Sequence, residues 1–598
     1  MDFEIKPKAD ILFEISWEVC NKVGGIYTVV VSKASQMLSY YKENYFLIGP
    51  YFSEKARGQF QEIVPPDDIK GIFSRLEQEG IKCHYGKWLI EGEPKTILID
   101  FADFFGQKNQ IRNELWETSK IDTLNSGFDF DEPMIFSWAS AKLIEQFILL
   151  YKDKKIVCQF HEWLCAAGLI YLKNRNLKTG LVFTTHATRL GRTLAELNLP
   201  LYSMLEGVDS DQLAYKYNIY DKHQLEKAAA QASHVFTTVS EITGIEAQYI
   251  LSRKPDFFLF NGLDISKFPS FEEIVIKHRI QRDRIREFIL YYFTPYYSFD
   301  VKETLLYTLH GRYEFRNKGI DLYIKALGQL NQKLKTSNNS QKTIVAFIFV
   351  PSNVRGIKPG LLEAREIYKD IKDYYEEISE ELKQNILYNL VSNRNISQSE
   401  LFTKTFLREI KSRILRLKKT GLPPVSTHDL ADPNDIILKA IKEAGLENKE
   451  EDKVKIIFYP IYLTGDDGLL HLNYYESIQG SHLGVFPSFY EPWGYTALEA
   501  AALGVSSVTT DLSGFGRFFK EENQDQLQPG IFILDRFGKQ DDEVTDSLSD
   551  FFYRFSQFSH QDRVKNKLRA REMAAKADWS ILIKNYIQAH NLALEKSL

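Results

Sequence analysis

Short apolar runs alternate with amphipathic stretches along most of this chain, the pattern expected when strands alternate with helices. In the first half, apolar runs predict strands at Asp10–Ser16, Tyr45–Ile48, Thr96–Phe101, Lys155–Phe160 and His234–Val239, with another ending at His186. Amphipathic stretches between them predict helices, the clearest at Tyr27–Tyr41, Glu132–Tyr151 and His223–Ala232. This alternation predicts a mostly parallel, doubly wound α/β sheet.

The same alternation resumes in the second half. Apolar runs predict strands at Leu305–Leu309, Val345–Val350, Leu483–Pro487, Val505–Thr510 and Gly530–Asp535. The chain has 598 residues, far more than the ~250–300 at which a single core stops growing. We therefore expect a first domain over residues 1–268, a connector over 269–303, a second domain over 304–560 and closing helices over 561–598.

The alternation stops inside the second domain, over residues of about 356–450. Apolar residues recur there every three or four positions from Ile367 to Leu390, which predicts a long helix with a narrow apolar seam. A second helix is expected at Thr405–Lys419, with isoleucines and leucines on one side and basic residues on the other. The two helices either pack against their own domain or form an inserted arm.

Composition is that of a globular protein, and it excludes several classes. Lys and Arg total 75 against 80 for Asp and Glu, a net charge of −5 that does not favour nucleic-acid or membrane-surface binding. No apolar run approaches the ~18 residues of a membrane span. The four cysteines form no CxxC pair, and the N-terminus lacks an apolar signal region. We therefore expect a cytoplasmic protein.

Candidate chemistry concentrates between His482 and Gly516. A strand there is followed by a polar and aromatic turn and by a helix that begins near Gly494. Glu491 lies in the turn and Glu499 on the helix, and free backbone amides at the helix start favour an anion. The spacing of the two glutamates carries little weight alone, because acidic residues are abundant in this chain.

Three further loops carry candidate ligands for phosphate groups or a sugar. They are Lys22 with Gly24 and Gly25 after the first strand, His186 with Arg192, and Arg312 with Lys318. A glycine-flanked Arg or Lys at a strand end can bind a diphosphate. Each pattern also has a simpler interpretation: a Gly–Gly turn, a structural histidine or a solvated basic face.

A metal site is not predicted. Asp129-Phe130-Asp131 has the Asp-x-Asp spacing of some metal-dependent transferases. We interpret it as the loop before a helix, with Asp131 near the N-cap, because aspartate is a favoured capping residue. No other cluster has the spacing of metal ligands.

Several motifs, in the same order along nearly the whole chain, resemble one family. FPSFYEPWGYTALEA, EVCNKVGGIYTVV, HATxxGR and GRYEFRNKG are similar to motifs of the animal and fungal type of glycogen synthase, in glycosyltransferase family 3. The resemblance implies the GT-B architecture, two Rossmann-like domains facing across a cleft, with a helical insertion in the second. It also implies transfer of glucose, with retention, from UDP-glucose or ADP-glucose to glycogen or another α-1,4-glucan.

The resemblance implies a role for each matching residue. Glu491, His186, Arg312 and Lys318 would act in catalysis, and Tyr474 would stack on the nucleotide base. The other donor-binding residues would be Lys22, Gly24, Gly25, Arg192, Trp493, Gly494, Tyr495, Thr496 and Glu499. Glu162 and Asn261 would lie on the acceptor side. Neither a cofactor nor a metal is expected, and the inserted arm would serve a homo-oligomer, a tetramer by resemblance.

Regulation is where the sequence departs from the family. The arginine-dense helix that reads glucose-6-phosphate in regulated members is thinned here, and we expect a short form without the phosphorylated C-terminal tail. His278, His482, Arg569 and Arg571 are the candidate effector residues. Phe260 also stands where the family usually has proline before NGL.

Three functions remain open from the sequence. The first is a glycogen synthase, with UDP-glucose favoured as the donor. The second is a related GT-B glucosyltransferase that uses ADP-glucose or another acceptor, since a tyrosine stacks on either base. The third is a non-catalytic glucan-binding scaffold, against which the retained site residues argue.

Overall fold

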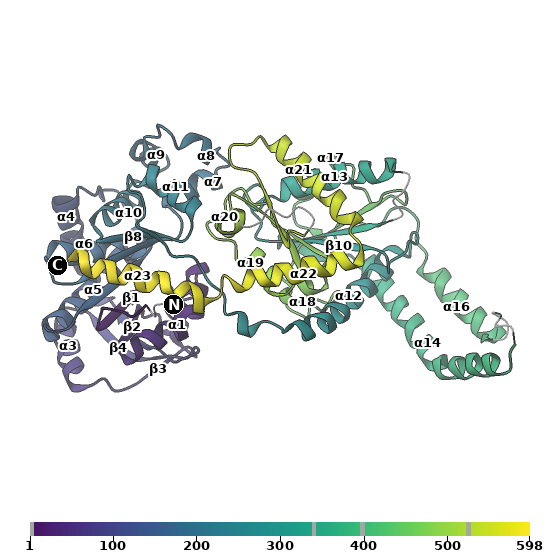
Figure 1. Cartoon of the computed structure of the whole chain (residues 1–598), viewed down its shortest axis with the longest axis horizontal. Helices are drawn as coiled ribbons and strands as arrows, with labels where there is room; N and C mark the ends of the chain where they lie inside the picture. The colour runs from purple at the N-terminus through teal and green to yellow at the C-terminus, as the bar shows by residue number, and fades with distance from the viewer. Residues whose placement is uncertain (1–4, 338–341, 395–396, 398–400, 522–527, 598) are drawn as a thin grey trace.

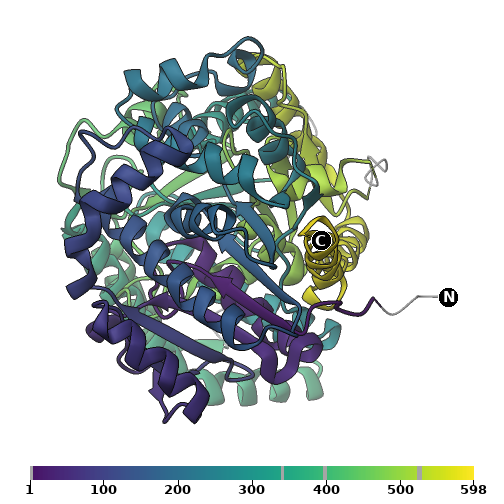
Figure 2. The same cartoon turned by 90° about the vertical axis from the view of Figure 1, so that its left-hand side faces the viewer.

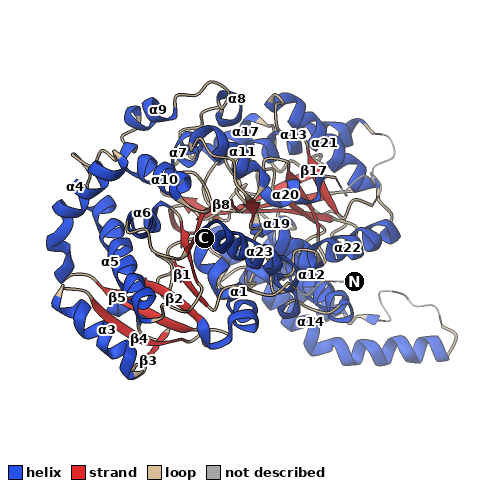
Figure 3. Cartoon of the chain, turned by 60° about the vertical axis from the view of Figure 1, so that its left-hand side comes forward, coloured by secondary structure: helices blue, strands red, loops and turns tan. Residues whose placement is uncertain are grey.

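The computed structural model describes residues 5–337, 342–394, 397, 401–521 and 528–597. Two α/β domains lie side by side, and a pair of helices projects from the second (Figure 1). Strands form the centre of each domain and helices cover both faces (Figure 3). The expected fold class, two Rossmann-like domains with a helical insertion, is confirmed.

The first domain is built on one nine-stranded sheet in the order β3-β4-β5-β2-β1-β6-β7-β8-β9. Its strands are β1 (Ile11–Ile15), β2 (Tyr45–Pro50), β3 (Phe60–Glu62), β4 (Lys82–Trp88), β5 (Lys95–Asp100), β6 (Ile156–His161), β7 (Gly180–Thr185), β8 (Val235–Thr238) and β9 (Phe257–Phe258). The pairs β3–β4 and β4–β5 are antiparallel, and the others are parallel. The sequence did not predict this antiparallel edge.

Helices cover both faces of the first sheet. They are α1 (Gly25–Tyr41), α2 (Ser53–Ala56), α3 (Asp67–Gln78), α4 (Lys108–Ser119), α5 (Phe128–Leu150), α6 (Ala166–Asn174), α7 (Arg189–Glu196), α8 (Leu201–Met204), α9 (Ser210–Lys216), α10 (Tyr220–Ala232) and α11 (Glu241–Ile250). Side chains alternate along β1: Phe13 joins the core shared with α5, whereas Leu12 joins the core shared with α1. Glu14 therefore points toward α1.

The Asp-x-Asp sequence does not cap α5 as expected. The N-cap is Gly127, so Asp129 and Asp131 lie in the first turn. Asp131 is buried and accepts a hydrogen bond from Nε of Arg112 at 2.9 Å. Its charge is thus neutralised by an arginine, and carboxylates in a first turn also favour the helix dipole.

The second domain contains a six-stranded, fully parallel sheet in the order β14-β11-β10-β15-β16-β17. Its strands are β10 (Leu305–His310), β11 (Ile344–Phe349), β14 (Val454–Tyr459), β15 (Leu483–Val485), β16 (Ser506–Thr510) and β17 (Ile531–Leu534). A separate antiparallel pair consists of β12 (Val354–Ile357) and β13 (His428–Leu430). The helices that cover this sheet include α13 (Ile320–Thr336), α17 (Ile436–Glu443), α18 (Tyr474–Gly480), α19 (Tyr495–Ala502), α20 (Gly514–Lys520) and α21 (Asp541–Gln557).

The expected connector, residues 269–303, is mostly one helix. α12 (Phe271–Phe293) begins with a capping box formed by Ser270 and Glu273. Its second half is apolar and packs on the second domain, where Phe288 contacts Phe347. This segment is therefore part of the second domain and not a separate linker.

The insertion forms the arm that projects in Figure 1. α14 (Pro359–Val391) and α16 (Lys404–Leu417) run as a pair, and Tyr374 stacks on Phe406 at a centroid distance of 5.2 Å. Near the end of α14, Leu387, Leu390 and Val391 are exposed. The prediction of an arm, as opposed to packing against the domain, is confirmed.

Two closing helices belong to different domains. α22 (His560–Ala575) stays on the second domain, where Asn566 accepts a hydrogen bond from the amide of Gly530. α23 (Trp579–Ser597) returns to the first domain and packs beside α1 (Figure 2). Of the two closing helices, only α23 thus crosses to the first domain, from about residue 578.

Candidate active site

The cleft between the two domains has a volume of about 720 Å³. The first domain contributes the β1–α1 loop, the ends of β6 and β7, and α7. The second contributes the β10–α13 loop and the turn before α19. Strand ends from both sheets therefore meet at one site, as expected for a ligand cleft in open α/β sheets.

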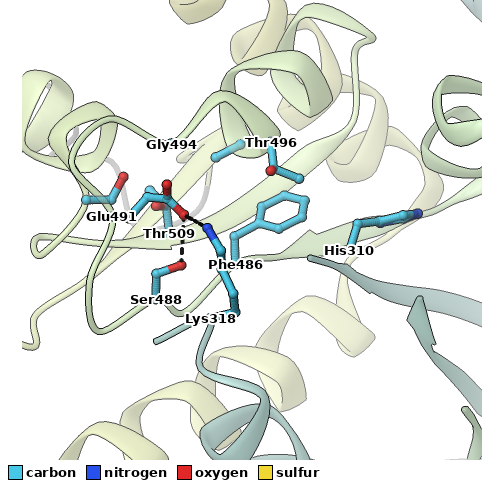
Figure 4. Close-up of a pocket in the computed structure, with 10 residues that line it drawn as sticks. His310, Lys318, Phe486, Ser488, Glu491, Gly494, Thr496 and Thr509 are labelled. Carbon is cyan, nitrogen blue, oxygen red and sulfur yellow. Dashed lines mark hydrogen bonds and ion pairs between the residues drawn. The ribbon is translucent and has the colours of Figure 1, made fainter. Parts of the chain in front are cut away.

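Lys318 and Glu491 form the centre of the second domain's wall. The ammonium group of Lys318 donates a hydrogen bond to Glu491 Oε2 at 2.6 Å, and Ser488 Oγ lies 3.5 Å from the same oxygen (Figure 4). Both charged side chains are mostly shielded from solvent, with 16% and 20% of their surfaces exposed. The sequence predicted both residues, and the structure places them in direct contact.

The backbone at Gly494 requires glycine. Its φ is +110°, and a Cβ there would lie 2.6 Å from Ser513 Oγ. This geometry turns the chain into α19, whose first residues, Tyr495 and Thr496, line the cleft. Backbone amides at a helix start and the positive end of the helix dipole favour an anion there, beside Lys318.

Tyr474 and Glu499 also meet. Glu499 accepts hydrogen bonds from the hydroxyl groups of Tyr474 at 2.8 Å and Tyr475 at 3.0 Å. Burial raises the pKa of Glu499. The ring of Tyr474 lies against His310, which ends β10, with the ring planes nearly perpendicular.

Arg312 lines the cleft but remains largely in solvent. Its side chain is 68% exposed and contacts Glu314 at 2.8 Å. It is therefore free to swing toward a ligand without breaking a buried contact. Trp493 also lines the cleft, and its largely buried ring packs against Phe260, Phe515 and Phe518.

The first domain's loop is organised by Glu18. This carboxylate accepts hydrogen bonds from the amides of Gly24 at 2.7 Å and Tyr27 at 2.9 Å. Gly24 and Gly25 line the cleft as expected. Lys22 is exposed instead, and its ammonium group lies 5.7 Å from the centre of the Tyr27 ring.

His186 and Glu162 lie at the ends of neighbouring strands. Glu162 accepts hydrogen bonds from the amides of His186 at 2.7 Å and Ala187 at 3.1 Å. Burial raises the pKa of Glu162 to about 7, although Arg192 opposes the shift. Arg192 and Asn261 line the same cleft, and Asn261 Oδ1 is buried without a hydrogen-bond partner in the described part of the chain.

Contacts across the cleft hold the two domains together on one side. The Tyr490 hydroxyl donates to Glu246 at 3.3 Å, and Arg517 forms an ion pair with Glu241 at 2.7 Å. Phe260 lies 5.7 Å from Trp493. Phe260, which stands where the family usually has proline, thus adds an aromatic contact between the domains.

Known proteins are similar to this one along nearly its whole length. The family model described as "Glycogen synthase" matches residues 14–598. The chain is 36% identical to mouse liver glycogen [starch] synthase over 98% of its own length and 84% of that protein. It belongs to the glycogen synthase family. The Neurospora crassa glycogen [starch] synthase is 35% identical over 99% of this chain and 84% of that one.

Solved structures support the fold of this glycogen synthase family member. The catalytic domain of starch synthase IV from Arabidopsis thaliana, bound to ADP and acarbose, aligns with a TM-score of 0.52 at 15% identity. The alignment covers 98% of this chain and all of that one. At this identity the similarity concerns the fold alone.

The four candidate effector residues of this family member do not form one site. His278 lies in a pocket between α12 and α22, and its Nδ1 is 3.0 Å from Nζ of Lys567. His482 is buried and accepts a hydrogen bond from the amide of Leu306. Arg569 pairs with Glu572, and Arg571 contacts the carbonyl groups of Ile265 and Pro269.

Some residues of the cleft were not predicted. Glu18, His161, Glu246 and His310 are buried polar groups at or beneath it. Glu18 and His161 lie close in sequence to predicted residues, and His310 ends a predicted strand, so polar residues at strand ends were the available signal. Glu246 lies within α11 and has no such signal.

Among the described residues, no group of three or more His, Cys, Asp or Glu side chains is arranged to hold a metal ion. No helix among them has the length and apolar character needed to cross a membrane.

Proposed function

We propose that this protein is a glycogen synthase that transfers glucose from UDP-glucose to the non-reducing end of an α-1,4-glucan, with retention of the anomeric configuration. The observation that carries the proposal is the pair Lys318–Glu491, at 2.6 Å, beside the start of α19. A cation, a carboxylate and free helix amides meet there at one point of a cleft between two domains. Membership of the glycogen synthase family supports the choice of substrates.

The leaving diphosphate is the charge that must be stabilised. Lys318 and the first amides of α19 face it from one side, and Arg312 reaches it by swinging away from Glu314. Lys318 and the helix amides are already in place, and preorganised donors stabilise developing charge at little reorganisation cost. We therefore propose that transfer requires no metal ion.

Glu491 orients the glucosyl unit in this proposal. Without a ligand it pairs with Lys318. When a diphosphate competes for the lysine, Glu491 becomes free to accept hydrogen bonds from sugar hydroxyls. His186 faces the same space from the first domain, and Glu162 holds its backbone through the amide at 2.7 Å.

Tyr474 would stack on the nucleotide base, and Glu499, held by two tyrosine hydroxyls, would bind the ribose from α19. Gly24, Gly25, Arg192, Tyr495 and Thr496 line the donor space. Asn261, with its unpartnered Oδ1, would bind the acceptor.

We also propose an anionic effector site between α12 and α22. The pocket there has a volume of about 600 Å³, and its basic lining residues include His278, Arg282, Arg286 and Lys567. Burial, followed by the nearby Arg282 and Arg563, lowers the pKa of Lys567 to about 7. A sugar phosphate would restore the charge of this lysine, so loss of glucose-6-phosphate activation in Lys567→Ala would support the site.

The arm would join copies of this chain into a homo-oligomer, a tetramer by family resemblance. Exposed apolar residues near its tip support this part of the proposal: Leu387 is 63% exposed and Val391 is 79% exposed. We place the protein in the cytoplasm, which is supported by four free cysteine thiols.

The test is incorporation of labelled glucose into glycogen from UDP-glucose and, in parallel, from ADP-glucose, each with and without glucose-6-phosphate. We expect incorporation from UDP-glucose and its loss in Glu491→Ala. Incorporation only from ADP-glucose would reassign the donor. No incorporation from either, or full activity in Glu491→Ala, would overturn the proposal.

A further inference from the structure

A continuous chain of buried polar side chains runs beneath the cleft floor from His186 into the core of the first domain. His186 Nε2 lies 3.0 Å from His161 Nδ1. His161 Nε2 lies 2.7 Å from Glu14 Oε1. The same carboxylate contacts the ammonium group of Lys33 and accepts a hydrogen bond from the Tyr45 hydroxyl at 2.6 Å.

Glu14 is the fixed end of this chain. Burial alone would raise its pKa, but Lys33 and His161 together hold the pKa well below its usual range. A carboxylate that receives three donors in this way stays ionised. It can therefore only accept hydrogen bonds.

Both histidines are neutral. Burial lowers the pKa of His161, in spite of the opposing effect of Glu14. Burial, with His161 and Lys33 next in effect, lowers the pKa of His186 well below its usual value. Each ring thus carries one proton, on one of its two nitrogens.

The positions of these protons follow from the contacts. Because Glu14 can only accept, the proton of His161 lies on Nε2. His161 Nδ1 is then bare and accepts, so the proton of His186 lies on Nε2. This leaves Nδ1 of His186 without a proton. In the described part of the chain Nδ1 makes no hydrogen bond, and His186 lines the cleft.

We propose that Glu14 and Lys33 act through His161 as positioning residues that keep His186 in its Nε2-protonated form, with a bare Nδ1 presented to the substrate. The proposal rests on the proposed function, which supplies the substrate. A bare imidazole nitrogen accepts a hydrogen bond from a sugar hydroxyl and places a lone pair near a glucosyl unit that becomes positive during transfer. The opposite tautomer would present an N–H donor to the same group.

The far side of the charge pair is closed by α23. The ring of Tyr586 lies 5.0 Å from the ammonium group of Lys33. His590 bonds to Tyr41 at 3.0 Å and to Gln159 at 3.1 Å. Water is thus kept from Glu14 and Lys33, whose side chains have no exposed surface. A dry environment holds the proton order, because no solvent molecule can replace a partner.

The first experiment observes the protons directly. Protein labelled with 15N-histidine contains 12 histidines, and the His186 ring signals are those lost in His186→Asn. Between pH 6 and 8 we expect a protonated Nε2 and a bare Nδ1 on His186. A protonated Nδ1, or two protons on either His161 or His186, would overturn the proposal. This measurement needs no activity, so it remains decisive even if no glucosyl transfer is found.

The second experiment replaces the polar groups around Glu14 by apolar side chains, which keeps the core filled. Glu14→Met, Lys33→Met and Tyr45→Phe are combined, because replacing a buried ion pair by apolar side chains of similar volume often preserves stability. His161 then loses the carboxylate that accepts its Nε2 proton, and His186 is no longer held in one tautomer. We expect kcat to fall about 10- to 100-fold, the usual effect of losing an outer partner of a site residue, with the KM for UDP-glucose unchanged.

Two controls separate positioning from simple destabilisation. Thr179→Val removes a buried hydroxyl that bonds to the Ile156 carbonyl, just before β7 and away from the His186 end of that strand, and kcat should be retained. Glu14→Gln keeps an oxygen that can accept from His161, and it should retain more activity than the triple variant. A folded triple variant with full kcat, or a fall seen only in KM, would overturn the proposal. Absence of transfer in the unmodified protein would instead refute the proposed function.

Discussion

Replacing Arg312 by alanine isolates its contribution to the reaction from any contribution to the fold. Its side chain is 68% exposed, and its ion pair with Glu314 lies near the surface. Exposed pairs of this kind contribute ~0–1 kcal/mol to stability. We therefore expect the melting temperature of Arg312→Ala to match that of the unmodified protein.

The effect on the reaction should be much larger. Arg312 lies on the same wall as Lys318 and the start of α19, where the leaving diphosphate gathers charge. Once Arg312 has turned toward the ligand, its loss should resemble removal of one donor to developing charge, which costs about 2.7–4 kcal/mol. At ~1.4 kcal/mol for each factor of ten, this corresponds to a loss of about 10²–10³ in kcat.

The assay is initial-rate incorporation of labelled glucose into glycogen at saturating UDP-glucose, together with thermal unfolding. Arg408→Ala is a matched control, because Arg408 is 76% exposed, pairs with a nearby glutamate and lies on the arm. We expect the control to retain full kcat. If Arg312→Ala kept kcat within threefold of the unmodified protein, Arg312 would not stabilise the leaving group.

Three other predictions concern the fold, proton binding and assembly. Gly319→Ala should lower the melting temperature far more than Gly445→Ala. Both glycines have φ near +70°, but a Cβ at Gly319 would lie 2.1 Å from the Pro487 carbonyl oxygen, whereas a Cβ at Gly445 would meet open space. Equal effects would refute the steric argument. Burial raises the pKa of Glu246 from 4.5 to about 7. Between these two pH values the folded state keeps a proton that the unfolded state has lost. The free energy of unfolding should therefore fall as pH rises from 4.5 to 7. Glu246→Gln should flatten that fall, and an unchanged slope in a urea titration would show that Glu246 is already ionised. On the arm, Leu387→Asp with Leu390→Asp should reduce the mass measured by light scattering, and an unchanged mass would exclude the arm tip as an oligomer contact.

Much of the fold could be predicted from periodicity. The predicted strands agree with β1, β2, β10 and β16 to within a few residues, because each is an apolar run bounded by polar turns. The long apolar seam likewise predicted α14. The helix α12 was taken for a connector, because its charged first half and aromatic second half hide the period; its burial depends on Phe347 and other distant residues.

The candidate site could be predicted where a local motif and a strand end coincide. Lys318 and Glu491 are 173 residues apart and meet as expected. Lys22 and Trp493 were assigned from motifs alone: Lys22 lies by the Tyr27 ring, and Trp493 lines the cleft with its ring packed on Phe260. Which way a side chain points depends on contacts with distant elements, such as Phe260 for Trp493. The series of contacting side chains from His186 to Lys33 was not predicted, because its members come from separate strands and helices.

The return of α23 to the first domain has a consequence for how the protein is made. Ile583, Tyr586 and Ile587 complete the core on the α1 face of a sheet whose strands end at Phe258. During synthesis, the part of that face covered by α23 stays exposed while more than half of the chain is still being added. Domains usually fold in order as they emerge from the ribosome. Here the first domain is the first to begin folding and the last to be finished.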